Sequence, residues 1–447
     1  MSTDLIGTAT AIAGAAADGE QIDVMLSRGR STSVKVYDGE VESFTSSESF
    51  GAGIRVIVDG RVGFAHAGSL DPDVLAATLA DARDNVRFSE RDEWVGLAEP
   101  DGVPAVLADH WNPDIVELDA AEKIATAIDL ERRTRSQDPR ITGVRLAAWG
   151  DGAGEYAYAA SNGIAYADRG TSVSVGVQPL AVEGDETQIG YAGDAARAVE
   201  DLDLDRVATE AAERATRLLG ATKPASAKLT ILLDPRLAGT LLGIVSGMLD
   251  GEAVAKGRTP FAERVGEQIA SPLLSVVDDP TRPESLGADS WDGEGLATRP
   301  NSLITAGVLD GFLHNSYTAR RAGVASTGSA TRGARSLPGV SAKVLVMEPG
   351  LRTFDELVAS IDHGVWVNTF AGLHSGVNPI SGDFSVGADG LMIRHGELAE
   401  PIREVTIASS IQRLLLDIVE VGGDAEWFPG GDYLASLLIG DVSMSGT

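Results

Sequence analysis

The sequence contains no cysteine among its 447 residues. Disulfide bridges, thiolate ligands to a metal ion and a cysteine nucleophile are therefore excluded. A chain without cysteine suits the reducing cytoplasm, which is the location we expect. Long apolar runs are also missing, because the longest, Leu237 to Leu249, is shorter than the roughly 20 residues that span a bilayer. We expect no membrane segment.

Positive charge is scarce. The chain has 36 Lys and Arg residues against 66 Asp and Glu residues, which gives a net charge of −30. Affinity for nucleic acid rests on basic side chains that neutralise phosphates, so we expect no direct binding to nucleic acid. The hydrophobic content of 43% and the charged content of 23% are typical of a soluble globular protein.

Several common catalytic motifs are absent. The segment Gly328–Gly333 has the glycine spacing of a phosphate-binding loop but no lysine after it. Gly51–Gly53 continues into a strand-like sequence, where a dinucleotide-binding loop would lead into a helix. The near matches to a hydrolase nucleophile elbow, 372–376 and 243–247, have the wrong spacing. These three chemistries have no sequence support.

The histidines are not paired at a spacing that would put two imidazoles on one metal ion. They are His66, His110, His314, His363, His374 and His395. One open alternative is an independent hydrolase, with a site assembled across strands. It would use His363, His374, Asp383 and His395. The plainer interpretation is ordinary surface or hydrogen-bonded histidines.

Turn and cap signals predict an α+β fold. Asp38-Gly39 and Asn162-Gly163 lie between β-type runs and are typical of tight hairpin turns. Asp119 to Ser136 and Asp203 to Leu219 are typical of helices, and a further helix is predicted over Ser409 to Val421. The order of strands and helices indicates antiparallel strands in the first half and a strand-rich second half.

A small-residue stretch from Gly220 to Ala227 marks the predicted domain boundary. We therefore expect two domains, an N-terminal α/β domain with antiparallel strands over 1–222 and a strand-rich C-terminal domain over 228–447. A helix over 235–250 opens the second domain, since Asp234 and Pro235 provide a cap and a first position.

Motifs along most of the chain carry a family resemblance. In the second half they are PFAERVGEQIASPLLSVVDD, ending at Asp279, then DGEG at 292–295, NSLITAGVLDGFLHNSYTARRAG at 301–323, STG at 326–328 and NPISGDF at 378–384. In the first half they are GEVESFTSSESFGAGIRV and ADRGTSVSVGV. In their order and spacing these motifs resemble the TldD/PmbA family, also described as modulators of DNA gyrase, and within it the TldE (PmbA) branch.

The resemblance implies a subunit without a metal ion. In the TldD branch, zinc is held by a His-Glu-x-x-x-His segment on the helix that opens the second domain and by a cysteine near the C-terminus. Here Gly243, Ile244 and Met248 stand at the three positions, and no cysteine exists. Such side chains supply neither imidazole ligands nor a general base. The resemblance therefore implies no cofactor or metal in this chain, with zinc expected in a TldD-type partner.

The same resemblance implies a heterodimer that admits unfolded or short peptides and degrades or trims them. Whether this chain is itself an enzyme stays open, and we expect it to be inactive alone. An alternative is a standalone homodimeric peptide-binding or regulatory protein without proteolytic activity. Read without the family, the helix is apolar nearly all round, and Gly243 and Gly247 predict the close approach of another element, in the core or at a subunit interface.

Polar positions flanked by glycine are the candidate peptide contacts. They are Asn315, Arg320, Thr327, Asn378, Ser381 and Asp383. For each of them, a turn cap or a local hydrogen bond is the competing interpretation.

Overall fold

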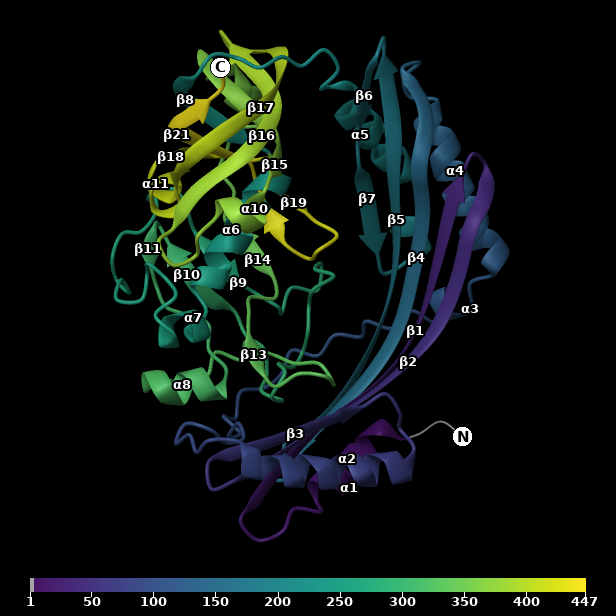
Figure 1. Cartoon of the computed structure of the whole chain (residues 1–447), viewed down its shortest axis with the longest axis vertical. Coiled ribbons are helices and arrows are strands. Elements are labelled where there is room, and N and C mark those ends of the chain that lie inside the picture. The colour runs from purple at the N-terminus through teal and green to yellow at the C-terminus, as the bar shows by residue number, and fades with distance from the viewer. Residues whose placement is uncertain (1–3) are drawn as a thin grey trace.

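Two long antiparallel hairpins dominate the first half of the chain (Figure 1). The computed structural model describes residues 4–447. Strand β1 (Glu20–Tyr37) returns as β2 (Glu40–Val58), and β4 (Ile141–Ala160) returns as β5 (Ala165–Glu183). The turn Asp38–Gly39 has φ values of 53° and 77°, the left-handed conformation that a tight hairpin requires. The residue order Asp-Gly therefore fixes the first hairpin, as the sequence predicts.

These hairpins belong to one seven-stranded antiparallel sheet. Its order is β3-β2-β1-β4-β5-β6, and β7 also pairs with β5. The added strands are β3 (Arg61–Ala67), β6 (Glu186–Ile189) and β7 (Ala192–Ala196). In Figure 1 the long strands run as a curved layer beside the C-terminal half.

Helices cover the sheet at two places. The helices and 3-10 helices of this half are α1 (Leu5–Ala13), α2 (Pro72–Asn85), η1 (Val86–Phe88), α3 (Pro113–Glu117), α4 (Ala120–Arg135), η2 (Val199–Asp201) and α5 (Leu204–Thr216). The pair α1 and α2 forms one hydrophobic core with β1, β2 and β4, and the pair α4 and α5 forms another with β4, β5 and β7. Helices predicted from Asp119 and Asp203 are thus confirmed as α4 and α5.

Side chains alternate between the two faces of the sheet, as strand geometry requires. Ile22 and Val24 pack under α1 and α2. Asp23 and Met25 point the other way, and Met25 shares a core cluster with Trp291 of the C-terminal half. One face of β1 therefore belongs to the N-terminal core, and the other contacts the second half.

The second half has two six-stranded sheets, in the orders β11-β10-β9-β14-β20-β19 and β17-β16-β15-β8-β21-β18, and a two-stranded sheet in which β12 pairs with β13. The strands are β8 (Ala227–Leu233), β9 (Val276–Asp278), β10 (Asn301–Thr305), β11 (Val308–Leu309), β12 (Ala330–Thr331), β13 (Gly339–Val340), β14 (Leu345–Met347), β15 (His363–Ala371), β16 (Asp383–Arg394), β17 (Glu397–Ser410), β18 (Ile418–Val421), β19 (Glu426–Trp427), β20 (Tyr433–Leu434) and β21 (Leu437–Ser445). The helices are α6 (Pro235–Met248), α7 (Gly251–Ala255), α8 (Ser316–Ala322), α9 (Phe354–Ala359), α10 (Leu373–Gly376) and α11 (Ile411–Leu416). The fold is α+β with a strand-rich C-terminal half, as expected.

The single helix predicted over Ser409 to Val421 is wrong. Helix α11 ends at Leu416, and the next residues form strand β18, which pairs with β21. The sequence Ile418–Val421 has three β-branched residues in four, and β-branched side chains favour a strand once a partner strand is available. None of the helices within residues 4–447 is long and apolar enough to cross a membrane.

The two halves approach closely at the loop that contains Ala334. A Cβ atom built on Gly53 would lie 2.3 Å from the Ala334 carbonyl oxygen, and one built on Gly51 would lie 2.7 Å from the Ala334 Cβ. Atoms do not approach so closely, so any larger residue at either position of β2 would push the loop away. The glycines let the C-terminal half lie directly on the sheet.

Candidate functional site

Helix α6 occupies the place where the family resemblance puts a metal site. Asp234 caps it, since its carboxylate accepts a hydrogen bond from the Leu237 amide at 2.9 Å, and Pro235 fills the first turn. Leu241 and Val245 on its inner face are almost fully buried in the C-terminal core. The cap and the apolar face explain why this segment forms a helix.

The outer face of α6 is open. Gly243 and Gly247 are exposed, and a Cβ atom built on either would meet no atom within 4 Å among the described residues. Within residues 4–447 no element of this chain packs on these two glycines, so the approach of another element at a subunit interface stays a prediction.

The positions that supply two zinc ligands and a general base in the TldD branch do not fit those roles here. Met248 is 1% exposed and packs in the core, whereas Gly243 faces outward. Ile244 between them is aliphatic. A glycine, an aliphatic side chain and a buried thioether supply none of the imidazole, thiolate or carboxylate ligands that zinc takes.

The alternative hydrolase site is not assembled. His363 is the first residue of the nine-residue strand β15, and His374 lies in α10 just beyond the other end of that strand. At about 3.3 Å per residue, the strand separates the two histidines by roughly 25 Å. His395 pairs instead with exposed Asp362, Nδ1 to Oδ1 at 2.7 Å. Within residues 4–447 no group of three or more His, Asp and Glu side chains could hold a metal ion.

The first three candidate peptide contacts, Asn315, Arg320 and Thr327, make local or interdomain hydrogen bonds. The Asn315 side-chain oxygen Oδ1 caps α8 by accepting a hydrogen bond from the Thr318 amide at 2.9 Å. Arg320 donates to three backbone carbonyls of the 94–97 segment, at 2.7 to 3.0 Å, and so ties α8 to the N-terminal half. Thr327 Oγ1 donates to the His314 carbonyl oxygen at 3.0 Å.

The other three candidates form one exposed turn before β16. The Asn378 side chain accepts from the Ile380 amide at 2.9 Å, and Ser381 Oγ donates to the Asp383 carboxylate at 2.7 Å. These are the turn hydrogen bonds that the competing interpretation names. No interaction joins this turn to Asn315, so a shared role of all six residues in peptide binding stays a prediction.

Cavities lie where β4 and β5 face the C-terminal half. Three of them adjoin one another, with volumes of about 580, 510 and 380 Å³, and the Tyr156 side chain lines all three. A fourth, of about 500 Å³, lies between the sheet and the β19–β20 hairpin, and Arg236 of α6 reaches it. These volumes fall in the roughly 300–1,000 Å³ range of small-molecule and peptide pockets.

Acidic groups surround the shared part of these cavities. Burial raises the pKa of Asp168 above its ordinary value, and the nearby charge of Asp289 adds to the rise. Asp289 accepts a hydrogen bond from the Tyr156 hydroxyl at 3.1 Å and pairs with Lys343 at 2.5 Å. The cleft is thus lined by titratable groups held by partners from both halves of the chain.

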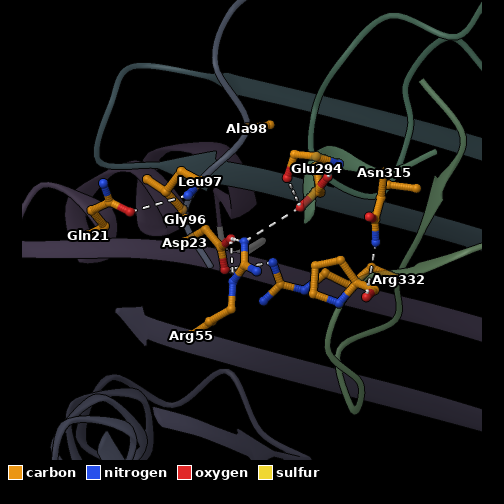
Figure 2. Close-up of polar contacts among 12 residues, drawn as sticks. Gln21, Asp23, Arg55, Gly96, Leu97, Ala98, Glu294, Asn315 and Arg332 are labelled. Carbon is orange, nitrogen blue, oxygen red and sulfur yellow. Dashed lines mark hydrogen bonds and ion pairs between the residues drawn. The ribbon is translucent and has the colours of Figure 1, made fainter. Parts of the chain in front are cut away.

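A buried ionic cluster, made of Asp23, Arg55, Arg332 and Glu294, joins the two halves (Figure 2). Asp23 is fully buried and accepts from Arg55 Nε at 2.9 Å and from Arg332 Nη1 at 2.7 Å. Burial by itself would raise the pKa of Asp23, but the two guanidinium groups outweigh it and lower the pKa below its ordinary value. Asp23 is therefore a carboxylate at neutral pH.

Glu294 extends this cluster to helix α8. It lies 3.9 Å from Arg55 and accepts hydrogen bonds from the Ser316 amide at 2.8 Å and the Ser316 hydroxyl at 2.7 Å. Close by, burial and then the charge of Glu294 raise the pKa of Asp292 to about 7, although three backbone amides donate to its carboxylate. The DGEG segment at 292–295 is thus a structural junction of both halves.

Sequence reasoning missed this cluster, although it had noted its parts. Arg55 and Glu294 lie in the motifs that carry the resemblance, and Arg332 lies in the segment rejected as a phosphate-binding loop. A usable signal was an arginine within an otherwise apolar strand sequence, Gly53 to Val58, because a buried charge needs a partner.

Comparisons with known proteins cover almost the whole chain. Residues 22–86, 113–219 and 226–446 match the PmbA/TldA metallopeptidase domain 1, central domain and C-terminal domain. The first two regions contribute strands to the same sheet. Metalloprotease PmbA from Escherichia coli O157:H7 is 28% identical over 426 residues, which cover 95% of this chain and 91% of that protein.

Solved structures are similar over the same length. A protein from Bacteroides thetaiotaomicron, whose name refers to a modulator of DNA gyrase, has a TM-score of 0.89 at 26% identity and covers 100% of both chains. TldE from Thermococcus kodakarensis has a TM-score of 0.87 at 24% identity, covering 95% of this chain and 97% of that one. The second similarity shows the fold alone.

Proposed function

Because this chain belongs to the PmbA/TldD metallopeptidase family, we propose that it is the subunit without zinc in a two-chain metalloprotease. Its partner is a TldD-type chain that holds zinc through a His-Glu-x-x-x-His segment. The substrates are short or unfolded peptides, and the pair works in the cytoplasm. This chain is inactive alone and takes part by shaping the space around the partner's zinc ion.

Helix α6 is the observation that carries the proposal. The positions equivalent to the zinc ligands are Gly243 and Met248, of which one has no side chain and the other is buried in the core. A chain of a metallopeptidase family with these residues cannot activate a zinc-bound water itself. Catalysis by such a chain requires a second subunit.

Cavities beneath the sheet support a role with peptides. Three adjoin one another along β4 and β5, and their lining mixes aromatic, acidic and basic side chains. An extended peptide can use backbone hydrogen bonds along a strand and place its side chains in neighbouring pockets. The net charge of −30 argues against a direct role on DNA.

Co-expression tests the proposal. The chain is purified alone and together with the TldD-type chain of the same genome, and zinc content and cleavage of an unfolded peptide are measured for each. We expect zinc and cleavage only with the partner present, and loss of both when the two histidines of the partner's motif are replaced by alanine. That partner variant is the matched control, because this chain is unchanged in it.

Two results would overturn the proposal. One is stoichiometric zinc, or peptide cleavage, in the chain purified alone. The other is a failure of the two chains to associate while this chain forms a stable homodimer that binds peptide, which is the behaviour of a standalone peptide-binding protein. Size-exclusion chromatography with light scattering distinguishes the two assemblies.

A further inference from the structure

The outer edge of strand β2 has no partner strand beside its first half. Strand β2 pairs with β1 along its whole length, but β3 pairs only with Ala52–Val58. Between Glu40 and Phe50 no strand within residues 4–447 lies on the outer side, and every residue there is exposed except the partly exposed Ser43. In Figure 1 this part of the hairpin, in purple, rises at the right-hand rim of the sheet. One long edge of the sheet is therefore open to pairing.

The open edge offers backbone hydrogen-bonding groups at every second residue. Val58 and Arg61 close the tight turn between β2 and β3, so the even-numbered residues of Ala52–Val58 bond to β3 and the odd-numbered residues bond to β1. The register between β1 and β2 runs without a shift from Val58 back to Ser43, so the same alternation continues along the open part. The N–H and C=O groups that point outward there belong to Phe44, Ser46, Glu48 and Phe50.

Helix α4 holds the hairpin in place. The Asp38 and Gly39 amides at the hairpin tip donate to the Glu131 carboxylate at 2.9 and 2.8 Å. Val34 and Val36 of β1 are fully buried in the core that α4 shares with the sheet. A strand fixed in this way loses little conformational freedom when another strand pairs with it, which favours association.

Apolar side chains are exposed along the same edge. Val41 and Phe44 lie opposite Val36 and Val34, on the face of the sheet that the helices cover. Phe50 lies on that face too, because every second residue of a strand points the same way. Val41, Phe44 and Phe50 are 41%, 43% and 43% exposed. An added strand would cover these side chains while it pairs with the backbone groups beside them.

The charge of the edge decides what kind of strand can pair with it. The edge carries Glu40, Glu42 and Glu48, and no basic residue lies between Glu40 and Ile54. A second copy of this edge would bring further carboxylates onto the neighbouring strand, and like charges on paired strands repel each other. A strand with a lysine or arginine opposite Glu48 would be attracted instead. The acidic residues therefore favour a different chain over a second copy.

We propose that the outer edge of β2, from Ser43 to Phe50, pairs with an edge strand of the zinc-bearing partner chain. The partner's strand carries apolar side chains opposite Phe44 and Phe50 and a lysine or arginine opposite Glu48, since directly paired residues share one face of a sheet. The choice of the zinc-bearing chain rests on the proposed function. The open edge itself rests on the pairing of β2 within this chain.

Hydrogen exchange followed by mass spectrometry tests the pairing in the full chain. Exchange is compared between this chain alone and its complex with the TldD-type chain of the same genome. We expect the amides of Phe44, Ser46 and Glu48 to exchange at least about tenfold more slowly in the complex, because each then donates to a neighbouring strand. Unchanged exchange at these amides in a complex that has formed overturns the proposal.

A proline variant tests the same edge by affinity. Ser46→Pro removes an outward N–H group but no hydrogen bond to β1, and sheets tolerate proline on edge strands for that reason. We expect the Kd for the TldD-type chain, measured by biolayer interferometry, to rise at least about tenfold. The matched control Ser46→Ala keeps the N–H group and should leave the Kd within about twofold of wild type.

Two results of the proline experiment are decisive. A Ser46→Pro chain that is folded, as judged by circular dichroism, and binds the TldD-type chain as tightly as wild type overturns the proposal. Should Ser46→Pro not fold, hydrogen exchange in the wild-type complex decides.

A charge reversal tests the residue expected opposite Glu48. Glu48→Lys should raise the Kd at least about fivefold at low salt, because it places like charges across the pairing. Glu397→Lys, which changes an exposed residue at the start of β17, is the matched control and should have little effect. A Kd that Glu48→Lys leaves unchanged overturns the lysine or arginine opposite this position.

Other occupants of the edge give different results. A dimer of this chain alone, seen by light scattering and dissociated by Ser46→Pro, identifies a second copy. Slower exchange at Phe44 to Glu48 when oxidised insulin B chain is added without the TldD-type chain identifies a peptide substrate. Either result overturns the pairing with the zinc-bearing chain.

The same experiments separate this pairing from the proposed function. A complex that holds zinc and cleaves peptide while the β2 edge exchanges freely refutes only the pairing. A complex that protects the edge but holds no zinc and cleaves nothing refutes the proposed function and supports the pairing. Two chains that do not associate refute both.

Discussion

Replacing Asp23 by Asn should be among the most destabilising single changes in this chain. Asp23 is completely buried and is the shared acceptor of Arg55 and Arg332, which come from different halves of the chain. Asn keeps the shape of the side chain but removes its charge. Two buried guanidinium groups then lose the carboxylate that compensates them.

The size of the effect follows from that loss. Breaking a buried ion pair by removing one partner costs about 3–5 kcal/mol, because an uncompensated charge remains in the interior. Glu294 lies 3.9 Å from Arg55 and offsets part of the loss on that side only. We therefore expect the free energy of unfolding of Asp23→Asn to fall by about 3 kcal/mol at pH 7.

Urea unfolding followed by circular dichroism measures this change. The matched control is Asp441→Asn, which removes the charge of an exposed pair with Lys228, with both side chains more than half exposed. An exposed pair contributes about 0–1 kcal/mol, so the control should change little. Asp441 has a φ of 59°, which asparagine tolerates as well as aspartate does.

Acid provides a second check. The pKa of Asp23 is lowered in the folded chain, against the opposing effect of its burial, by Arg332 and Arg55. Its contribution to stability is therefore fully present above the unfolded pKa of about 3.9 and is lost as the pH falls through the folded value. The difference between wild type and Asp23→Asn should shrink below about pH 4. A change smaller than about 1 kcal/mol at pH 7, or a difference that stays constant down to pH 2, would refute the reasoning.

Three further predictions concern other sites. Burial, and then the charge of Glu294, raises the pKa of Asp292 to about 7. The wild type should therefore lose stability relative to Asp292→Asn as the pH rises from about 4 to 7, by up to about 1.4 kcal/mol per pH unit. Urea titrations at several pH values measure this slope, and its absence would contradict the prediction. Gly243→Ala should stabilise the chain by about 0.5–1 kcal/mol, because the position is a helical site with open space around it. Gly239→Ala should instead lower the melting temperature, because its Cβ would lie 2.4 Å from the side chain of buried Leu434. Alanine at His363 and His374 together should leave peptide cleavage by the reconstituted pair unchanged, since both side chains are exposed and lie at opposite ends of β15. A loss of cleavage in a pair that still assembles would support the independent hydrolase.

Local signals in the sequence were sufficient for much of the fold. Asp38-Gly39 sets a hairpin through its own backbone preferences, and Asp234 with Pro235 starts α6. The helix predicted over Ser409 to Val421 is wrong because its last four residues pair with strand β21. That strand lies beside them only once the chain is folded, so no local signal in the segment reveals the pairing. Local preference decides a segment only when no tertiary pairing competes with it.

For the candidate site too, residue type settled one part and packing settled another. That Gly243, Ile244 and Met248 cannot serve as zinc ligands follows from residue type alone. That Met248 is buried while Gly243 faces open space follows only from how α6 packs. The glycine spacing itself is equally consistent with a face packed in the chain's own core and with one left open for a partner, so the sequence alone could not decide between them.

By itself, the sequence determined that this chain has no thiol chemistry, because the absence of cysteine holds in any fold. Only the tertiary structure decided which charges are buried together. Asp23 and Arg332 are 309 residues apart in sequence and 2.7 Å apart in space. Burial and partner choice are properties of packing between distant segments, so neither residue reveals its role until both halves of the chain are in place.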